Sequence, residues 1–145
     1  MAVVGYAPGV YDLFHVGHLN VLRRAREQCD VLVAGVVSDE VCLEAKGMTP
    51  WIPLAERMEI VSALDIVDAV HAETTLDKVD AWREVGFHRI FKGDDWRGTP
   101  KGDDLVARLG EVGVEVVFFP YTAHTSSSQL RRALTAPGRA IRVAS

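Results

Sequence analysis

Residues 9–18, which read Gly-Val-Tyr-Asp-Leu-Phe-His-Val-Gly-His, are the stretch of the chain best suited to chemistry. They join an apolar strand to a helix expected to begin near Gly17, through a turn that carries two histidines. The first backbone N–H groups of a helix have no partner within the helix, and the positive end of its dipole lies beside them. The turn is therefore expected to bind an anion such as phosphate.

The two histidines, His15 and His18, are three residues apart, so both imidazoles can face one point if the turn tightens into the helix. Ordinary surface or core histidines, or half of a metal site completed by His124, are the alternatives. The position favours phosphate, because the first strand-to-helix turn is the usual ligand position of an open parallel sheet. Asp12 is expected to order this turn by accepting hydrogen bonds from backbone N–H groups rather than to react.

The elements that must position this turn are read from the hydrophobic pattern. Apolar, β-rich runs at residues 3–6, 31–37, 69–71, 89–91 and 114–119 alternate with helical patterns. This alternation predicts an α/β fold, a Rossmann-like, doubly wound, parallel five-stranded sheet with helices on both faces. Helices are expected from about Gly17, over 54–64 after Pro53, in a short segment after Gly102, and over 127–134.

Length and composition limit the classes to which the protein can belong. With 145 residues, of which 48% are hydrophobic, the chain predicts one domain over residues 1–135 and a frayed tail over 136–145. A formal net charge of −4 argues against a nucleic-acid-binding surface. The first residues resemble no signal peptide and no apolar run is long enough to span a bilayer, so we expect a cytoplasmic protein without membrane insertion. Cys29 and Cys42 are expected to be reduced packing residues.

Four separated motifs carry a resemblance to a known family. They are Tyr-Asp-Leu-Phe-His-Val-Gly-His at 11–18, Leu-Ala-Glu-Arg at 54–57, Lys-Gly-Asp-Asp-Trp at 92–96 and Thr-Ser-Ser-Ser at 125–128. In this order and spacing the chain, from Val3 to about Leu134, resembles the H-x-G-H nucleotidyltransferases and, within them, the small cytidylyltransferases of the glycerol-3-phosphate cytidylyltransferase type. The resemblance implies attack by a phosphomonoester oxygen on the α-phosphorus of CTP, with pyrophosphate released and Mg²⁺ accompanying the triphosphate.

The resemblance also implies roles for particular residues. Catalytic roles fall to His15 and His18 as donors to the α-phosphate, to Lys46 on an apparent loop that closes over the phosphates, and to Arg57 as an anion ligand. A structural ion pair between Arg57 and Glu56 is the alternative for that arginine. No protein-held metal site is expected.

Nucleotide-binding positions follow from the same motifs. Around the turn they are Gly9, Val10, Tyr11 and Gly17, where backbone N–H groups approach phosphate. Near the base and ribose they are Gly93, Asp94, Asp95 and Trp96. Before the last helix they are Thr125, Ser126, Ser127 and Ser128, whose hydroxyls and free helix N–H groups would cradle the β- and γ-phosphates.

Two positions depart from the family pattern, because Asp65 and Tyr121 stand where glycerol-3-phosphate cytidylyltransferases usually carry arginine. They are expected to influence the choice of acceptor, unless Arg97, Arg131 or Arg132 supplies the missing charge. Glycerol 3-phosphate is the preferred acceptor. A phosphoethanolamine-type cytidylyltransferase, an adenylyltransferase of the same fold and a nucleotide-binding regulatory module are the alternatives. The family further implies a homodimer.

Overall fold

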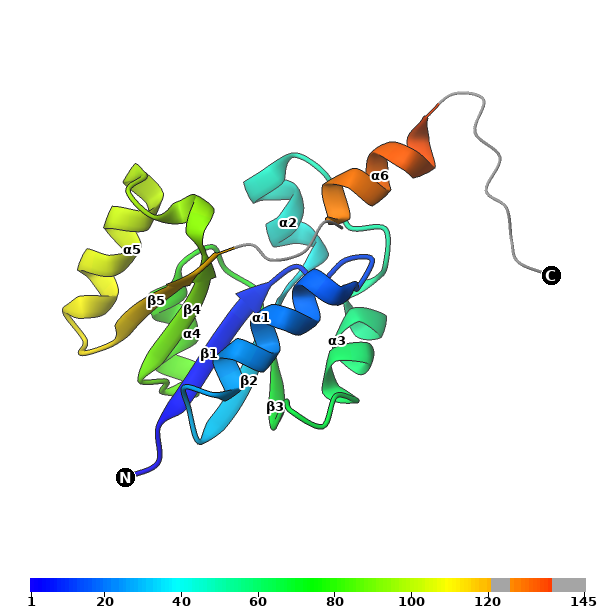
Figure 1. Cartoon of the computed structure of the whole chain (residues 1–145). Helices are drawn as coiled ribbons and strands as arrows, with labels where there is room; N and C mark the ends of the chain where they lie inside the picture. The colour runs from blue at the N-terminus through cyan, green and yellow to red at the C-terminus, as the bar shows by residue number, and fades with distance from the viewer. Residues whose placement is uncertain (121–125, 137–145) are drawn as a thin grey trace.

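The computed structural model describes residues 1–120 and 126–136, and these form one five-stranded parallel sheet flanked by helices (Figure 1). The strands are β1 (Val4–Gly9), β2 (Val31–Val37), β3 (Ala69–Glu73), β4 (Arg89–Gly93) and β5 (Glu115–Phe119). Their order in the sheet is β3-β2-β1-β4-β5, so β1 pairs with both β2 and β4. The predicted Rossmann-like sheet is confirmed, and its topological switch point lies between β1 and β4, where ligands of such sheets bind at the carboxyl ends of the strands.

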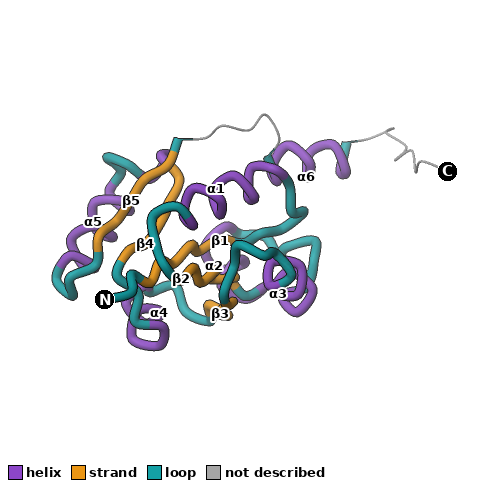
Figure 2. The backbone as a smooth tube through the Cα atoms, turned by 60° about the horizontal axis from the view of Figure 1, so that its bottom comes forward, coloured by secondary structure: helices purple, strands orange, loops and turns teal. Residues whose placement is uncertain are grey.

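Helices cover both faces of the sheet, as predicted. They are α1 (Val16–Arg26), α2 (Asp39–Lys46), α3 (Leu54–Ser62), α4 (Lys78–Val85), α5 (Pro100–Gly110) and α6 (Ser127–Thr135), with a short 3₁₀ helix η1 (Asp94–Trp96). Figure 2 shows α1 on one side of the strands and α4 on the other. Leu22 of α1 and Val61 of α3 belong to one buried cluster, whereas Val79 of α4 and Leu105 of α5 belong to a second.

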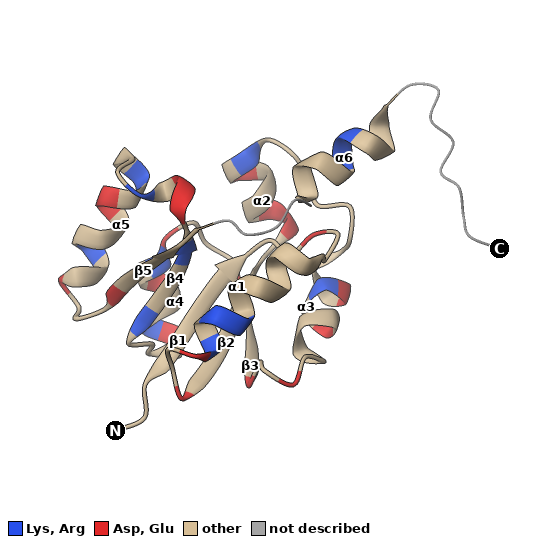
Figure 3. Ribbon diagram, in the orientation of Figure 1, with Lys and Arg blue, Asp and Glu red and all other residues tan. Residues whose placement is uncertain are grey.

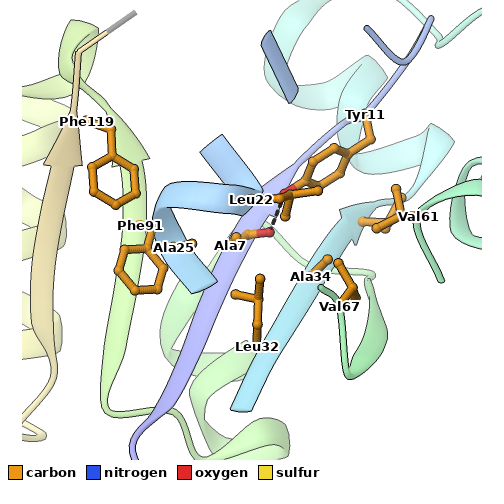
Figure 4. Packing of buried hydrophobic residues seen from close by; sticks show 11 residues of the cluster. Ala7, Tyr11, Leu22, Ala25, Leu32, Ala34, Val61, Val67, Phe91 and Phe119 are labelled. Atoms are coloured by element: carbon orange, nitrogen blue, oxygen red, sulfur yellow. Dashed lines mark hydrogen bonds between the residues drawn. The ribbon is translucent and has the colours of Figure 1, made fainter. Parts of the chain in front are cut away.

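The core follows from the alternation of side chains along strands that are buried on both faces. On one face Leu22 and Ala25 of α1 lie over Ala7 and Leu32, as the close view shows (Figure 4). On the other face Tyr6 stacks on the ring of Phe87 with centroids 4.5 Å apart. These two layers hold β1 in place and thereby fix the position of the turn that follows it.

Charge at the two ends of α1 differs. Its last turn is basic, with Arg23, Arg24 and Arg26, which complements the negative end of the helix dipole. Figure 3 shows these basic positions at the end of α1 remote from the β1–α1 turn. The positive end of the dipole therefore stays beside the two histidines, and no acidic residue occupies the first turn of the helix.

Helix α2 was not among the predicted helices, and Lys46, expected on a loop, is its last residue. The Ser38 hydroxyl caps its start by accepting a hydrogen bond from the Val41 N–H. Gly47 ends it in the left-handed conformation, with φ of 73°. Helix α4 was not predicted; it is a short helix between the Asp77 N-cap and the left-handed Gly86.

Among the helices that the structure describes, none has the length and apolarity needed to cross a membrane. Both cysteines are free thiols, with Cys42 buried and Cys29 half-buried. Of the expected tail, residues 137–145 lie outside the described part of the chain.

Candidate active site

A cavity of about 500 Å³ lies at the carboxyl ends of β1 and β4, at the switch point of the sheet. The β1–α1 turn, α1, α2, β4 and α6 all contribute to its lining. Most of the residues predicted from sequence line it together: Gly9, Val10, Tyr11, His15, Gly17, His18, Lys46, Gly93, Asp95, Trp96, Ser126, Ser127 and Ser128. Segments far apart in the sequence thus line one cavity.

Three predicted residues do not line this cavity, namely Arg57, Asp65 and Asp94. The Asp94 carboxylate instead accepts a hydrogen bond from Arg97 in an exposed ion pair. Thr125 and Tyr121 lie outside the described residues, as does His124.

The turn that carries the histidines has an unusual backbone. Tyr11 and Leu13 both adopt left-handed conformations, with φ of 56° and 52°, which costs free energy for residues other than glycine. The Tyr11 hydroxyl anchors the turn by donating to the Ala7 carbonyl at 2.8 Å. The buried Asp12 carboxylate accepts hydrogen bonds from the N–H groups of Trp51 and Ile52, each at 2.9 Å. The structural role predicted for Asp12 is confirmed.

Helix α6 docks on the same turn. Arg131 forms an ion pair with Asp12, and the Ser127 hydroxyl donates to the Asp12 carbonyl oxygen at 2.7 Å. Burial alone would raise the pKa of the Asp12 carboxyl, but the bonds from Trp51, Ile52 and Arg131 outweigh it and hold that pKa below its usual value. The carboxylate therefore stays ionised and keeps the turn, the 51–52 segment and α6 together.

The hydrogen bonds of the two histidines determine which ring nitrogen carries the proton. His15 is the N-cap of α1, and its Nδ1 accepts a hydrogen bond from the Gly17 N–H at 3.0 Å. The Nδ1 of His18 accepts from the His15 N–H at 3.2 Å. In each neutral ring the proton must then be on Nε2. The two Nε2–H groups remain to donate elsewhere, and Nε2 of His15 lies 3.4 Å from the Ser127 hydroxyl oxygen.

The surroundings of both imidazoles favour their neutral forms. Burial lowers the pKa of His15, and burial together with the neighbouring His15 lowers the pKa of His18 to about 4. The ring centroids lie 4.1 Å apart, so two positive charges here would repel each other. The free site therefore offers a pair of neutral N–H donors.

Arg57 has a different place from the one predicted. Its side chain is buried, and it donates at 2.7 Å to the carbonyl oxygens of Ile52, Val10 and Val37. Its ion-pair partner is Asp39, where the sequence had offered Glu56. The expectation of a direct anion ligand is corrected: Arg57 joins the carboxyl ends of β1 and β2 to the 51–52 segment, because three carbonyls and one carboxylate use its guanidinium donors.

The expectation that Asp65 influences the choice of acceptor by direct contact is also corrected. It is exposed in the connection between α3 and β3. Asp68, three residues later, binds the Leu32 N–H near the amino end of β2. Asp65 thus lies by the amino ends of the strands, whereas the cavity lies by their carboxyl ends.

Lys92 and Arg131 are among the cavity residues that were missed as site candidates. Lys92 stands in β4 directly before Gly93, within a motif used for the nucleotide positions, so its place at a carboxyl strand end was an available signal. Arg131 had been considered only as a source of replacement charge. Its pairing with Asp12 depends on the docking of α6, which local sequence does not reveal.

The lining is rich in hydrogen-bond donors. It combines two imidazole N–H groups, the start of α1, serine hydroxyls at the start of α6, and lysines. Among the described residues, no group of three or more His, Cys, Asp or Glu side chains could hold a metal ion. Fold and site together define an α/β protein with a cavity, lined by hydrogen-bond donors, at the switch point of its sheet.

Comparison with known proteins identifies the family. A family model described as cytidylyltransferase-like matches residues 6–133. The chain is 38% identical over 113 residues to an ethanolamine-phosphate cytidylyltransferase of Arabidopsis thaliana, covering 74% of this chain and 27% of the relative. It is 30% identical over 125 residues to a glycerol-3-phosphate cytidylyltransferase of Bacillus spizizenii, covering 86% and 91% respectively. The chain belongs to the cytidylyltransferase-like family.

The fold comparison agrees with the sheet described above. A lipopolysaccharide core biosynthesis protein of Thermoplasma volcanium superposes with a TM-score of 0.72 at 23% identity, over 86% of this chain and 100% of that one. The chain spans 27% of the length of the first curated relatives it matches, which are longer proteins.

Proposed function

We propose that this chain transfers a cytidylyl group from CTP to a small phosphorylated alcohol and releases pyrophosphate. The observation that carries the proposal is the pair of imidazoles that cap the start of α1 through Nδ1 and so keep a proton on each Nε2, that of His15 lying 3.4 Å from the Ser127 hydroxyl oxygen. Family membership supports nucleotidyl transfer as the reaction. Glycerol 3-phosphate and phosphoethanolamine are the acceptors we propose, because both chemistries occur in the names of the relatives.

The reaction needs no general base. A phosphomonoester has a second pKa near ~6, so the acceptor is mostly a dianion at neutral pH and its oxygen is already nucleophilic. The barrier lies in bringing two anions together and in stabilising the charge that builds at the α-phosphorus. Preorganised N–H donors at fixed positions meet that need, and His15 and His18 would contact the non-bridging oxygens of the α-phosphate.

The leaving pyrophosphate would lie towards α6. Ser126 caps this helix by accepting a hydrogen bond from the Gln129 N–H, and Ser127 and Ser128 line the cavity beside it. The free N–H groups of the helix start and these hydroxyls would hold the β- and γ-phosphates. A triphosphate beside the imidazoles would favour their protonated forms and strengthen both contacts.

Mg²⁺ belongs to the proposal as the ion that the triphosphate brings. The histidines, serines and lysines of the cavity are donors, its two carboxylates are those of Asp12 and Asp95, and the Asp12 carboxylate is engaged by Trp51, Ile52 and Arg131. Phosphate oxygens and water would therefore supply its ligands, which is the usual arrangement for this cation. It would neutralise phosphate charge, while the residues of the chain bind and orient the nucleotide.

The experiment that tests the proposal is a matrix of CTP, ATP, GTP and UTP against glycerol 3-phosphate, phosphoethanolamine and other phosphorylated alcohols, with Mg²⁺ and pyrophosphate release as the readout. CTP with one of these acceptors is expected to give turnover. His18→Ala is expected to lower kcat by about 10²–10³-fold, the scale of one lost donor to a charged transition state, with a smaller effect on CTP binding. Nucleotide binding without pyrophosphate release would instead favour a regulatory module. The homodimer we propose from the family is tested by sedimentation equilibrium.

A further inference from the structure

Lys92 is a cavity residue to which the proposed reaction has so far given no role. It stands in β4, two residues after the buried Ile90, so its side chain leaves the sheet on the same face as Ile90. That face is covered by α4 and α5. The ammonium lies 4.0 Å from the ring centroid of Trp96, which also lines the cavity.

The carboxylates near the Lys92 ammonium are those of Glu73, Asp94 and Asp95. Glu73 pairs with Lys78 and also accepts from the Tyr6 hydroxyl, Asp94 pairs with Arg97, and Glu73 and Asp95 both attract the ammonium electrostatically. No ion pair within 4.0 Å joins Lys92 to a described carboxylate. Contact with the face of Trp96 offers only part of the stabilisation that an anion would give.

The surroundings make this lack of an ion-pair partner costly. Burial first, and the positive charge of Lys78 next, lower the pKa of the Lys92 ammonium to about 8, although Glu73 and Asp95 act in the opposite direction. Lys46 adds further repulsion from across the cavity rim. A half-buried ammonium without an ion-pair partner within 4.0 Å is less stable than one whose environment an anionic ligand completes.

The position of Lys92 relative to the histidines indicates which anion would bind beside its ammonium. His15 and His18 begin α1, on the face opposite to α4 and α5, and Ser127 of α6 lies beside His15. The proposed triphosphate therefore occupies the α1 and α6 side of the cavity, and Lys92 stands on the other side. In displacement at phosphorus the attacking and leaving oxygens lie in line on opposite sides. An anion on the Lys92 side is then on the side of attack.

We propose that Lys92, beside Trp96, binds the phosphate of the acceptor and aims its oxygen at the α-phosphorus held by the two histidines. This inference rests on the proposed function and deepens it. In the step, one acceptor oxygen forms a bond to the α-phosphorus while the bond from that phosphorus to the bridging oxygen of pyrophosphate breaks. The electron pair of the broken bond leaves with pyrophosphate, and Lys92 neither gives nor takes a proton.

The test compares the full-length wild type with Lys92→Met, which keeps the length of the side chain and removes its charge. Lys92→Arg serves as the charge-retaining variant. Lys101→Met is the matched control, because Lys101 is an exposed lysine on α5 outside the cavity. Two readouts are taken: the KM of CTP and of the acceptor in turnover, and equilibrium binding of glycerol 3-phosphate and of phosphoethanolamine to protein saturated with α,β-methylene-CTP.

Lys92→Met is expected to raise the KM and the Kd of the acceptor by about 10–100-fold, the range for losing one hydrogen bond between charged groups, and to leave the Kd of CTP unchanged. Lys92→Arg should recover part of the acceptor affinity, and Lys101→Met should match the wild type. A loss of CTP affinity equal to that of the acceptor would overturn the proposal, because Lys92 would then belong to the nucleotide site. Unchanged affinity for both ligands would overturn it as well.

The binding arm separates this inference from the proposed function. If the wild type releases no pyrophosphate with any acceptor, the proposed function fails. A phosphomonoester that binds to the wild type and not to Lys92→Met would still support the Lys92 site. If Lys92→Met does not fold, as judged by its thermal unfolding, the same comparison is made with Lys92→Gln, and unchanged acceptor affinity there refutes the inference.

Discussion

Replacing Arg57 by methionine tests whether this residue is a structural junction or a phosphate ligand. The side chain is 1% exposed and donates to three carbonyl oxygens, those of Ile52, Val10 and Val37. Methionine fills a similar length with apolar atoms and removes every donor. The buried Val37 carbonyl and the part-buried Ile52 and Val10 carbonyls then lose this partner, and Asp39 loses its counter-ion.

The magnitude follows from these four contacts. A buried acceptor left without a partner costs about 1 kcal/mol or more, so three carbonyls contribute roughly 3 kcal/mol. Asp39 is 39% exposed at its side chain and is hydrated once unpaired, so it adds little. We expect a loss of about 3–5 kcal/mol in the free energy of unfolding. For a chain of this size that corresponds to a fall of roughly 10–15 °C in Tm.

The assay is thermal unfolding of the wild type and of Arg57→Met, together with CTP binding at a temperature where both are folded. Arg97→Met is the control, because Arg97 also loses an ion pair with an aspartate but is 65% exposed. This control is expected to cost less than about 1 kcal/mol. A Tm of Arg57→Met close to that of the wild type, combined with lost CTP affinity, would refute the structural interpretation and restore Arg57 as a phosphate ligand.

Two further predictions concern pH and acceptor choice. The pKa of His18 is about 4 in the folded protein, against ~6.5 for an unfolded histidine, so between these values the unfolded chain binds a proton that the folded chain does not. The free energy of unfolding, measured by urea denaturation, should therefore fall by about 2 kcal/mol from pH 7 to pH 5. This fall should largely disappear in His18→Gln. An equal fall in both proteins would show that His18 is not its source. Asp65→Arg should leave the ratio of the kcat/KM values for glycerol 3-phosphate and phosphoethanolamine unchanged, because Asp65 is exposed near the amino ends of the strands. A change of this ratio towards glycerol 3-phosphate would contradict the placement of Asp65 outside the site.

The sequence predicted the elements whose signal is local. Helices cover both faces of the sheet, so its strands are continuous apolar runs whose composition alone distinguished them from their surroundings. The β1–α1 turn was also readable, because glycine, aspartate and two histidines follow the first strand directly. Asp12 has the ordering role expected of it, although the backbone groups it binds, those of Trp51 and Ile52, are about forty residues away in the chain.

Roles that depend on contacts between distant segments could not be predicted in this way. Arg57 was expected to bind an anion because the family resemblance implied it, and only the packed structure shows that the carbonyls of Val10, directly after β1, and of Val37 in β2 accept its hydrogen bonds. Asp65 lies in register with an arginine position of the family, yet the direction of α3 carries it to the opposite end of the sheet.

The sequence by itself determined the class of fold and the anion-binding turn, because both arise from periodicity and from the chemistry of neighbouring residues. Only the tertiary structure decided the state of that turn. Each histidine carries its proton on Nε2 because its Nδ1 accepts a hydrogen bond from a backbone N–H, and the pKa of His18 is lowered because the ring is buried. The environment of the Lys92 ammonium likewise depends on which carboxylates the fold assigns to other cations. Such properties depend on burial and on distances between segments, which no local pattern of residue types specifies.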